Sequence, residues 1–323
     1  MQFHRRAALG ILLASAIAGP AFAQAFPAKP IKIIVPFPAG GGTDLFARTV
    51  GQKLTETNKW TVVIDNKPGA GGKLGVDAVA KSAPDGYTLV LGQTSNLAIN
   101  PTLYSKLPYD PVKDLAPVAL VASAPLLVVV AADSPFKSLA DIVAAAKAKP
   151  GALNFGSAGS GSATHINAEK FRSVAGYDAV HVPYKGTPEA ITETIAGRLD
   201  YFFAPIVSAL PMIRDGKLKA LAVGTGKRSA VMPQLPTTVE AGVPGSEYLF
   251  WVGLFAPAKT PKAVVERVQA EVAKIMTAPE LKERLDKLGA EAFTMPSAQF
   301  DQFLVDETAK AQQVVKAAGI KVD

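Results

Sequence analysis

The sequence has 323 residues, a formal net charge of +7 and no cysteine. The lack of cysteine excludes disulfides, thiol catalysis and thiolate metal sites, and the basic residues form no dense run of the kind that binds nucleic acid. Only His165 and His181 follow the N-terminal segment, too few for a histidine-rich metal centre, so we expect neither a metal nor a cofactor. A chain of this length is expected to form two lobes rather than one core.

The first 23 residues have the pattern of a secretory signal. Arg5 and Arg6 give a positive start, and residues 7–18 are apolar but too few to span a membrane. An Ala-Phe-Ala cleavage site ends at Ala23, after which we expect cleavage and export. The arginine pair leaves both the general secretory route and the twin-arginine route open.

The next stretch predicts a strand, a glycine turn and the start of a helix. Residues 31–35 are an apolar run typical of a buried parallel strand, and residues 45–54 carry apolar side chains at helical spacing. Between them, residues 36–44 include three consecutive glycines, which let the backbone approach a ligand next to the unpaired N–H groups of a helix N-terminus. The sequence alone leaves two interpretations, an anion site or an ordinary tight turn.

The rest of the first lobe repeats strands and turns. We expect strands over 61–65 and 88–92, a helix over 73–81, and a surface loop over 101–115. A polar cluster follows the 88–92 strand, at the end where open α/β sheets bind ligands. Its members are Gln93, Thr94, Ser95 and Asn96. The long apolar run 117–132 predicts two strands, or one strand that crosses between the lobes.

The second half shows the same units. Residues 156–164 form a Gly/Ser turn between a short strand at 153–155 and a helix, and three more strands are expected over 179–184, 199–204 and 218–224. Several helix caps are predicted from short polar residues and proline or glycine. They are Ser138 with Asp141, Thr187 with Pro188 and a stop at Gly197, Thr260 with Pro261, and Ser297. An aromatic run over 247–256 predicts a strand that returns to the first lobe.

Known catalytic patterns do not fit. No serine lies between glycines in the G-x-S-x-G spacing, and His165 is too close to Ser160 and Ser162 to favour a triad. The glycines at 40–42 do not match the dinucleotide-binding spacing, and nothing in the sequence brings Asp44, Asp65 and Asp200 together. We therefore expect no catalytic residue, with an exported ester hydrolase as a remote alternative.

Binding explains the two turns better than catalysis does. Each turn ends a strand and opens a helix, one in each lobe, so two helix N-termini can converge on one carboxylate. The expected donors from the second lobe are Ser157, Ser160, Ser162 and Thr164. Those from the first lobe are Thr43, Thr94, Ser95 and Asn96. No arginine lies inside either turn, which excludes bidentate ion pairing as the mode. The alternative is that the serines only cap the helix near residue 164.

Six motifs occur in the order of a known family. They are Pro36-Phe37-x-x-Gly40-Gly41-x-x-Asp44, Pro68-Gly69-Ala70-Gly71-Gly72, Pro84-Asp85-Gly86-Tyr87-Thr88, Asn100-Pro101-x-Leu103-Tyr104, Gly156-Ser157-x-Gly159-x-Gly161-Ser162-x-x-His165 and Val182-Pro183-Tyr184-Lys185-Gly186. From about Pro27 to the C-terminus, the chain resembles the Bug family, the periplasmic receptors of tripartite tricarboxylate transporters. The resemblance implies an α/β, two-lobed type II periplasmic binding-protein fold whose lobes are joined by crossover strands, and a location in the periplasm.

The resemblance also implies boundaries, a ligand and partners. Lobe 1 would comprise residues 24–125 and 249–323, and lobe 2 residues 126–248. A small organic carboxylate would bind between them, held largely through ordered waters by the loops at 37–44 and 157–165, and a large and a small integral membrane subunit would receive it. We expect a monomer that does not bind nucleic acid. The identity of the acid stays open, as does a second output, a ligand sensor that docks on a signalling partner.

The predicted ligand-binding residues fall into three groups. The first loop contributes Phe37, Ala39, Gly40, Gly41, Thr43 and Asp44, where the glycines admit the ligand and Thr43 and Asp44 hold the loop. The second loop contributes Ser157, Gly159, Ser160, Gly161, Ser162, Thr164 and His165. The distal part of the ligand is assigned to Gln93, Thr94, Ser95, Phe203 and Trp251.

Overall fold

The computed structural model describes residues 26–293, 295, 297–317 and 319–320. The signal segment expected over residues 1–23 lies outside this range. Within the described residues, no helix has the length and apolar character needed to cross a membrane.

The first lobe is built on a mixed sheet of six strands in the order β11-β4-β10-β3-β1-β2. β1 pairs in parallel with β2 on one side and with β3 on the other. β10 runs antiparallel to both β3 and β4. The strands are β1 (Ile31–Val35), β2 (Val62–Asn66), β3 (Thr88–Gln93), β4 (Leu115–Ala124), β10 (Phe250–Pro257) and β11 (Glu291–Ala292). The helices are α2 (Gly42–Asn58), α3 (Lys73–Ala80), α4 (Asn100–Leu103), α9 (Lys262–Met276), α10 (Pro279–Lys287) and α11 (Ser297–Ala317), with short helical turns η1 (Ala70–Gly72) and η2 (Ser95–Ile99).

The second lobe has a five-stranded sheet in the order β7-β6-β8-β5-β9. β6 pairs in parallel with β7 and β8, whereas β5 is antiparallel to β8 and β9. The strands are β5 (Leu126–Ala131), β6 (Asn154–Ser157), β7 (Val180–Pro183), β8 (Tyr201–Pro205) and β9 (Leu218–Val223). The helices are α5 (Leu139–Ala148), α6 (Ala163–Ala175), α7 (Thr187–Ile195) and α8 (Ile206–Arg214).

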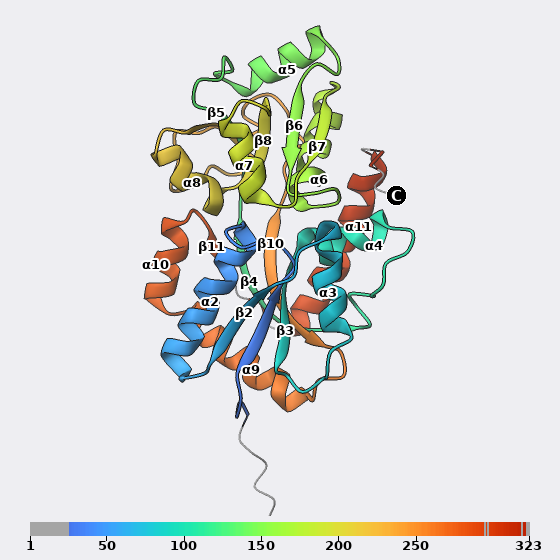
Figure 1. Cartoon of the computed structure of the whole chain (residues 1–323), viewed down its shortest axis with the longest axis vertical. Coiled ribbons are helices and arrows are strands. Elements are labelled where there is room, and N and C mark those ends of the chain that lie inside the picture. Colours follow the sequence, from blue (N-terminus) through green and yellow to red (C-terminus); the bar gives the residue numbers. More distant parts are fainter. Residues whose placement is uncertain (1–25, 294, 296, 318, 321–323) are drawn as a thin grey trace, which may run out of the picture.

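Two crossings connect the lobes, which are stacked along the long axis of the molecule (Figure 1). A single residue, Pro125, separates β4 in the first sheet from β5 in the second. Proline has no N–H to donate, so the hydrogen-bonded ladder of one sheet cannot continue through this position. The chain returns through residues 224–249, between β9 and β10. The apolar run 117–132 therefore forms two strands, one in each lobe.

Three inner strands of the two sheets are buried on both sides. Every residue of β5, β8 and β10 is buried, which explains why these segments are continuous apolar runs rather than alternating ones. The parallel strands β1, β3, β6 and β8 all end where the lobes meet, so the helices that follow begin there. This arrangement places the two predicted turns opposite each other.

Several local expectations differ from the structure. Residues 94–103 are helical rather than an irregular polar cluster followed by loop, and they pack against α11. Thr187 is the first residue of α7 and Gly186 is its N-cap, while α9 follows Pro261 without a side-chain cap from Thr260. The capping box of Ser138 and Asp141 is confirmed.

Candidate functional site

Helix α2 begins inside the protein without a capping side chain. Its first three residues, 42–44, are buried, and Gly41 at the N-cap position has no side chain that could accept a hydrogen bond. The first N–H of the helix with a backbone acceptor is that of Leu45, which donates to the carbonyl of Gly41 at 3.0 Å. The N–H groups of residues 42–44 therefore have no acceptor within the helix, and the helix dipole adds partial positive charge at this end. A buried helix end of this kind suits an anion.

The carboxylate of Asp44 fixes the conformation of the first loop through hydrogen bonds. It accepts hydrogen bonds from the backbone N–H of Gly40 at 2.9 Å, from Arg48 at 2.9 Å and from Asn66 at 2.9 Å. Burial by itself would raise the pKa of Asp44, but these hydrogen bonds outweigh it and lower the pKa below its usual value. Asn66 also donates to the carbonyl of Phe37. Asp44 thus stays ionised and fixes the glycine turn, which leaves the N–H groups of the helix end to another anion.

The second loop is held by its own hydroxyls. The Ser162 side chain caps α6 by accepting from the N–H of His165, and the Thr164 hydroxyl accepts from the N–H of Ala158 at 2.8 Å. The two hydroxyl oxygens are 3.0 Å apart. Two hydroxyls carry two hydrogens, and the bond between them uses one. One hydroxyl hydrogen therefore remains to donate to a ligand in the cleft.

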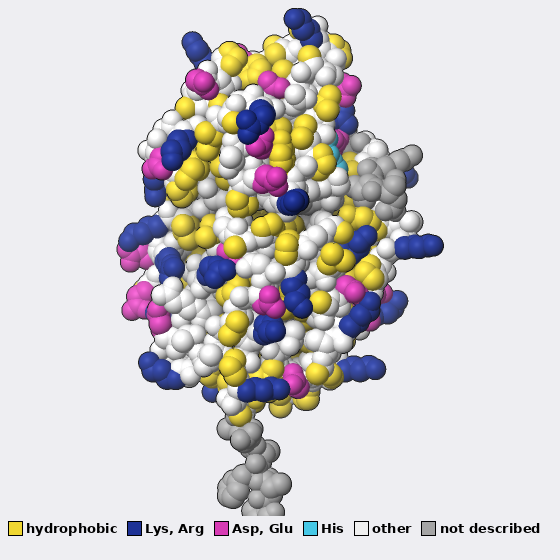
Figure 2. Space-filling model, in the orientation of Figure 1, with side chains coloured by type: hydrophobic (Ala, Val, Ile, Leu, Met, Phe, Trp, Pro, Cys, Tyr) yellow, Lys and Arg dark blue, Asp and Glu magenta, His cyan; other side chains and the backbone are white. Residues whose placement is uncertain are grey.

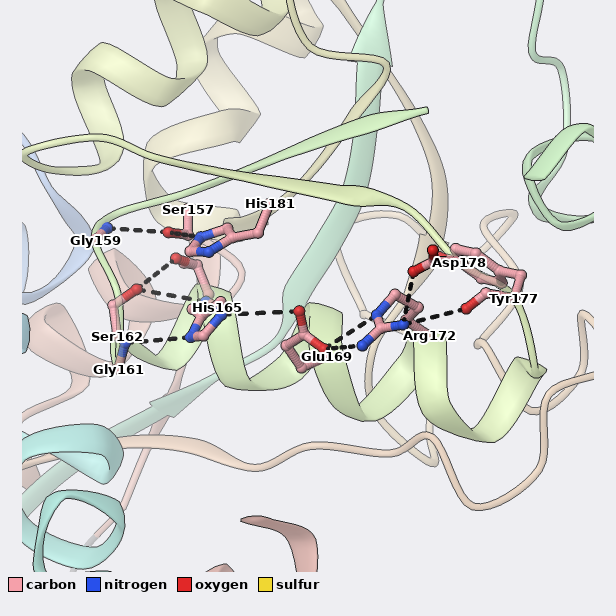
Figure 3. A network of polar contacts seen from close by, with 11 residues as sticks. Ser157, Gly159, Gly161, Ser162, His165, Glu169, Arg172, Tyr177, Asp178 and His181 are labelled. Carbon is pink, nitrogen blue, oxygen red and sulfur yellow. Dashed lines mark hydrogen bonds and ion pairs between the residues drawn. The ribbon is translucent and has the colours of Figure 1, made fainter. Parts of the chain in front are cut away.

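A chain of polar contacts extends from this loop along α6 (Figure 3). The Ser157 hydroxyl lies 2.6 Å from Nε2 of His181, and the rings of His181 and His165 stack with centroids 3.9 Å apart. His165 Nδ1 accepts from the N–H of Gly161 at 3.2 Å, so its proton is on Nε2, which faces Glu169 at 3.8 Å.

Both histidines are uncharged in this network. Burial, the neighbouring His181 and Arg172 lower the pKa of His165 to about 3, and burial lowers the pKa of His181 to about 4. Glu169 is engaged by Arg172 at 2.7 Å, which limits its power to favour a charged His165. The network therefore positions the second loop as a set of neutral groups.

The two loops meet around a cavity of about 20 Å³, room for about one water molecule. Its walls come from both turns and from the ends of β3, β8 and β10. They include Phe37, Gly41, Gly42, Thr43, Gln93, Ala158, Ser162 and Thr164, and also Thr187, Pro205 and Phe250. A solute larger than a water molecule therefore does not fit in the cavity in this arrangement of the lobes.

Close contacts between the lobes surround this cavity. A Cβ added at Gly42 would lie 3.0 Å from Pro205, and one at Gly71 would lie 2.9 Å from the carbonyl of Ser160. These glycines allow the backbones of the two lobes to approach each other. Gly42 therefore serves the contact between the lobes as well as the helix end.

The predicted site residues separate into three sets. Lining the cavity are Phe37, Gly41, Thr43, Gln93, Ser162 and Thr164. In the loops but outside the cavity walls are Ala39, Gly40, Asp44, Ser157, Gly159, Ser160, Gly161 and His165, several of which hold the loops in shape. The third set, Thr94, Ser95, Phe203 and Trp251, lies elsewhere.

The members of the third set serve the cores and crossings. Trp251 is fully buried against Phe300 and Phe303 and donates to Glu307, and Phe203 packs on Phe171 inside the second lobe. Thr94 receives the N–H of Trp251 at 2.9 Å. We leave these residues out of the proposed site.

Sequence reasoning missed Thr187, Pro205 and Phe250. Phe250 is the neighbour of the predicted Trp251 on β10, and neighbouring strand residues face opposite sides. Thr187 follows β7 and Pro205 is the last residue of β8, so the rule that ligands bind at the carboxyl ends of parallel strands could have found them.

Charged side chains are scattered over the molecular surface. Lysine and arginine are interspersed with aspartate and glutamate over both lobes on the face shown in Figure 2. Among the described residues, no group of three or more histidine and acidic side chains is arranged to hold a metal ion.

Comparison with known proteins places the chain in a family. Residues 46–320 match the family described as "Tripartite tricarboxylate transporter family receptor" (TctC). The protein BugT of Bordetella pertussis is 35% identical over 318 residues, covering 98% of each chain. An R. palustris protein solved with adipate has a TM-score of 0.89 and 33% identity over 92% of this chain and 99% of its own. MatC from Rhodopseudomonas palustris, solved with bound malate, has a TM-score of 0.85 and 33% identity over 90% of this chain and 100% of its own.

These likenesses extend over nearly the whole chain. The structural neighbours are periplasmic binding proteins, which confirms the α/β, two-lobed fold class. The family and these neighbours are solute-binding receptors rather than enzymes. The chain belongs to the TctC family of periplasmic solute-binding receptors, and the resemblance to the Bug proteins is confirmed.

Proposed function

We propose that this receptor captures a small organic carboxylate between its lobes and delivers it to the large and small membrane subunits of a tripartite transporter. The observation that carries the proposal is the buried, uncapped start of α2, which lines the same cavity as Ser162 and Thr164 of the other lobe. One lobe offers N–H groups and the other a hydroxyl, so a carboxylate has donors on both sides. The adipate and malate of two structural neighbours are both organic carboxylates.

The capture requires the lobes to move. We propose that residues 24–125 and 249–323 form one lobe and residues 126–248 the other, and that the solute enters while they are apart. Closure then removes water from the carboxylate and strengthens its contacts with the helix end. The closed shape would be the form that membrane subunits recognise, in the periplasm after removal of residues 1–23.

Thermal unfolding in the presence of candidate solutes tests the ligand class. A carboxylate at 100 times its dissociation constant should add about 2.7 kcal/mol to the free energy of unfolding, a readily measured rise in melting temperature. The panel should include adipate, malate, tricarboxylates, acidic amino acids and aromatic acids, with neutral sugars and cations as controls. Stabilisation by a sugar or a cation but by no carboxylate would contradict the proposal.

Delivery needs a separate test. The receptor with its solute should drive uptake into vesicles that contain the large and small membrane subunits, whereas a receptor that cannot close should not. Full solute binding without stimulation of uptake by its own membrane subunits would contradict the transport role and leave the binding role intact.

A further inference from the structure

We call the cavity between the two loops the carboxylate cavity. A second hollow lies on the other face of the strand ends that line it. Its volume is about 530 Å³, within the usual range for small-molecule sites. Gln93 and Phe250 line the carboxylate cavity, whereas their neighbours Thr94 and Leu249 line this hollow, and the two spaces share no lining residue. We call it the hinge crevice and define it by Thr94, Pro125, Lys170, Tyr248, Leu249 and Val314.

Both lobes and both crossings form the walls of the hinge crevice. Lys170 and Ile166 project from α6 of the second lobe, and Val314 projects from α11 of the first. Pro125 belongs to one crossing and Tyr248 to the other. A molecule in the hinge crevice would therefore touch both lobes at the point about which they move.

Lys170 is a partly buried cation with few acceptors. Its ammonium group donates to the backbone carbonyl of Glu247, and within the described part of the chain no carboxylate is within ion-pair distance of it. An ammonium group has three N–H donors, so two are left for other partners. Burial lowers the pKa of Lys170 in spite of the charge of Glu247 nearby. An anion in the hinge crevice would complete the coordination of this group.

Glu247 also lines the hinge crevice, and its carboxylate acts on Lys170 from beyond ion-pair distance, whereas the other charges there have partners or lie in solvent. Glu307 accepts from Lys310 at 2.9 Å and from the Trp251 indole at 3.1 Å. Arg228 pairs with Glu240 at 2.8 Å. Lys227 and Glu291 are exposed. Lys170 is therefore the cation best placed to hold an anion inside the hinge crevice.

The remaining walls are mostly apolar. Aliphatic side chains from Ile99, Ile166, Ala311 and Val314 line the hinge crevice. The hydroxyls of Ser229 and Tyr248 are buried in residues that line it, and neither has a hydrogen-bond partner among the described residues. A ligand with an apolar body and a polar head matches this combination.

We propose that the hinge crevice is a second ligand site, which binds a small amphiphilic anion with its carboxylate on Lys170 and its aliphatic chain between α6 and α11. This site is separate from the carboxylate cavity, and its ligand differs in having a long apolar chain.

Isothermal titration of the receptor with octanoate tests the proposal. We expect saturable binding of one octanoate per chain, weakened at least tenfold in Lys170→Met and abolished in Val314→Trp, which fills the hinge crevice without removing the cation. Lys282→Met is the matched control, because Lys282 is an exposed lysine on α10, and it should bind as the wild type does. Gly42→Asp, which alters the carboxylate cavity, should also retain octanoate binding.

Three results would overturn the proposal. One is the absence of saturable octanoate binding to the wild type. Another is wild-type affinity in both Lys170→Met and Val314→Trp. The third is loss of octanoate binding in Gly42→Asp, which would place octanoate in the carboxylate cavity instead. If Lys170→Met fails to fold, Val314→Trp still decides the outcome.

Discussion

Two of the helices that begin at the carboxylate cavity, α2 and α6, differ in how their first N–H groups are satisfied. Helix α6 is capped by its own Ser162, whose hydroxyl accepts from His165. Helix α2 begins at a glycine and has no capping side chain, although its first turn is buried. A capped helix end has less to offer an anion, whereas an uncapped buried end leaves its N–H groups free to bind one. Of these two helices, α2 therefore offers free backbone N–H groups to an anion, whereas the start of α6 offers a hydroxyl.

Placing a carboxylate on the uncapped helix end should have the largest effect. In Gly42→Asp the new side chain would neutralise the N–H groups of α2 and would meet Pro205 when the lobes close. Overpacking of 1–3 kcal/mol added to charge repulsion should weaken solute binding by more than about 100-fold. Titration calorimetry measures the affinity, and the free energy of unfolding without solute should not fall.

A second glycine provides the control for Gly42→Asp. Gly226 lies in the crossing between β9 and β10, and a Cβ there would meet only Glu247 at 3.9 Å. Gly226→Asp should bind the solute as the wild type does. Normal affinity in Gly42→Asp would contradict the role of the α2 helix end.

Removing a hydroxyl on the other side of the cavity should have a smaller effect. Thr164→Val keeps the shape of the side chain but removes the acceptor for Ala158 N–H and one of the two hydroxyls that line the cavity. A hydrogen bond to a charged group contributes about 1.5–3 kcal/mol, so affinity should fall at least about tenfold. Thr194→Val is the control, because the hydroxyl of this buried threonine bonds to Ala190 within α7. Equal affinities in the two variants would argue against a ligand contact by this pair.

The cap of α6 can be separated from its ligand role with a second capped helix. Ser138 caps α5 in the second lobe, away from the cavity. Ser138→Ala and Ser162→Ala should each lower the free energy of unfolding by about 1 kcal/mol, as measured by urea denaturation. Only Ser162→Ala should also weaken solute binding. If both variants bind normally, Ser162 acts as a helix cap alone.

The sequence predicted the strands and turns well because each has a local cause. Apolar runs such as residues 31–35 indicate strands that are buried on both faces, and glycines indicate turns. The sequence could not show which side chains of β10 face the cavity, because all eight residues of this strand are buried. No alternation of polar and apolar residues distinguishes the side of Phe250 from that of Trp251. The place of Thr187 and Pro205 near the carboxyl ends of β7 and β8 could have been predicted, but their contact with the first lobe depends on how the lobes pack, which no local pattern records. The helical form of residues 94–103 was missed for the same reason, since packing on α11 supports it.

Acid should loosen the second loop before it affects the first. His165 and His181 have folded-state pKa values of about 3 and about 4, below the usual 6.5. The unfolded chain therefore binds more protons than the folded chain between those values and 6.5, so stability falls as the pH drops through this range, by up to about 1.4 kcal/mol per pH unit for each histidine. Asp44, whose pKa is lowered, loses its contribution only at more acidic pH.

Urea denaturation between pH 4 and 7 measures this difference between the two loops. The double variant His165→Asn with His181→Gln keeps acceptors and donors near Gly161 and Ser157 but cannot titrate. Its free energy of unfolding should therefore change less between pH 6.5 and pH 4 than that of the wild type. Parallel curves for the two proteins would show that the histidines are not held neutral by burial. A weaker dependence of the free energy of unfolding on pH in the variant would assign the acid sensitivity to the second loop. The first loop, which precedes α2, would then be unaffected over this pH range.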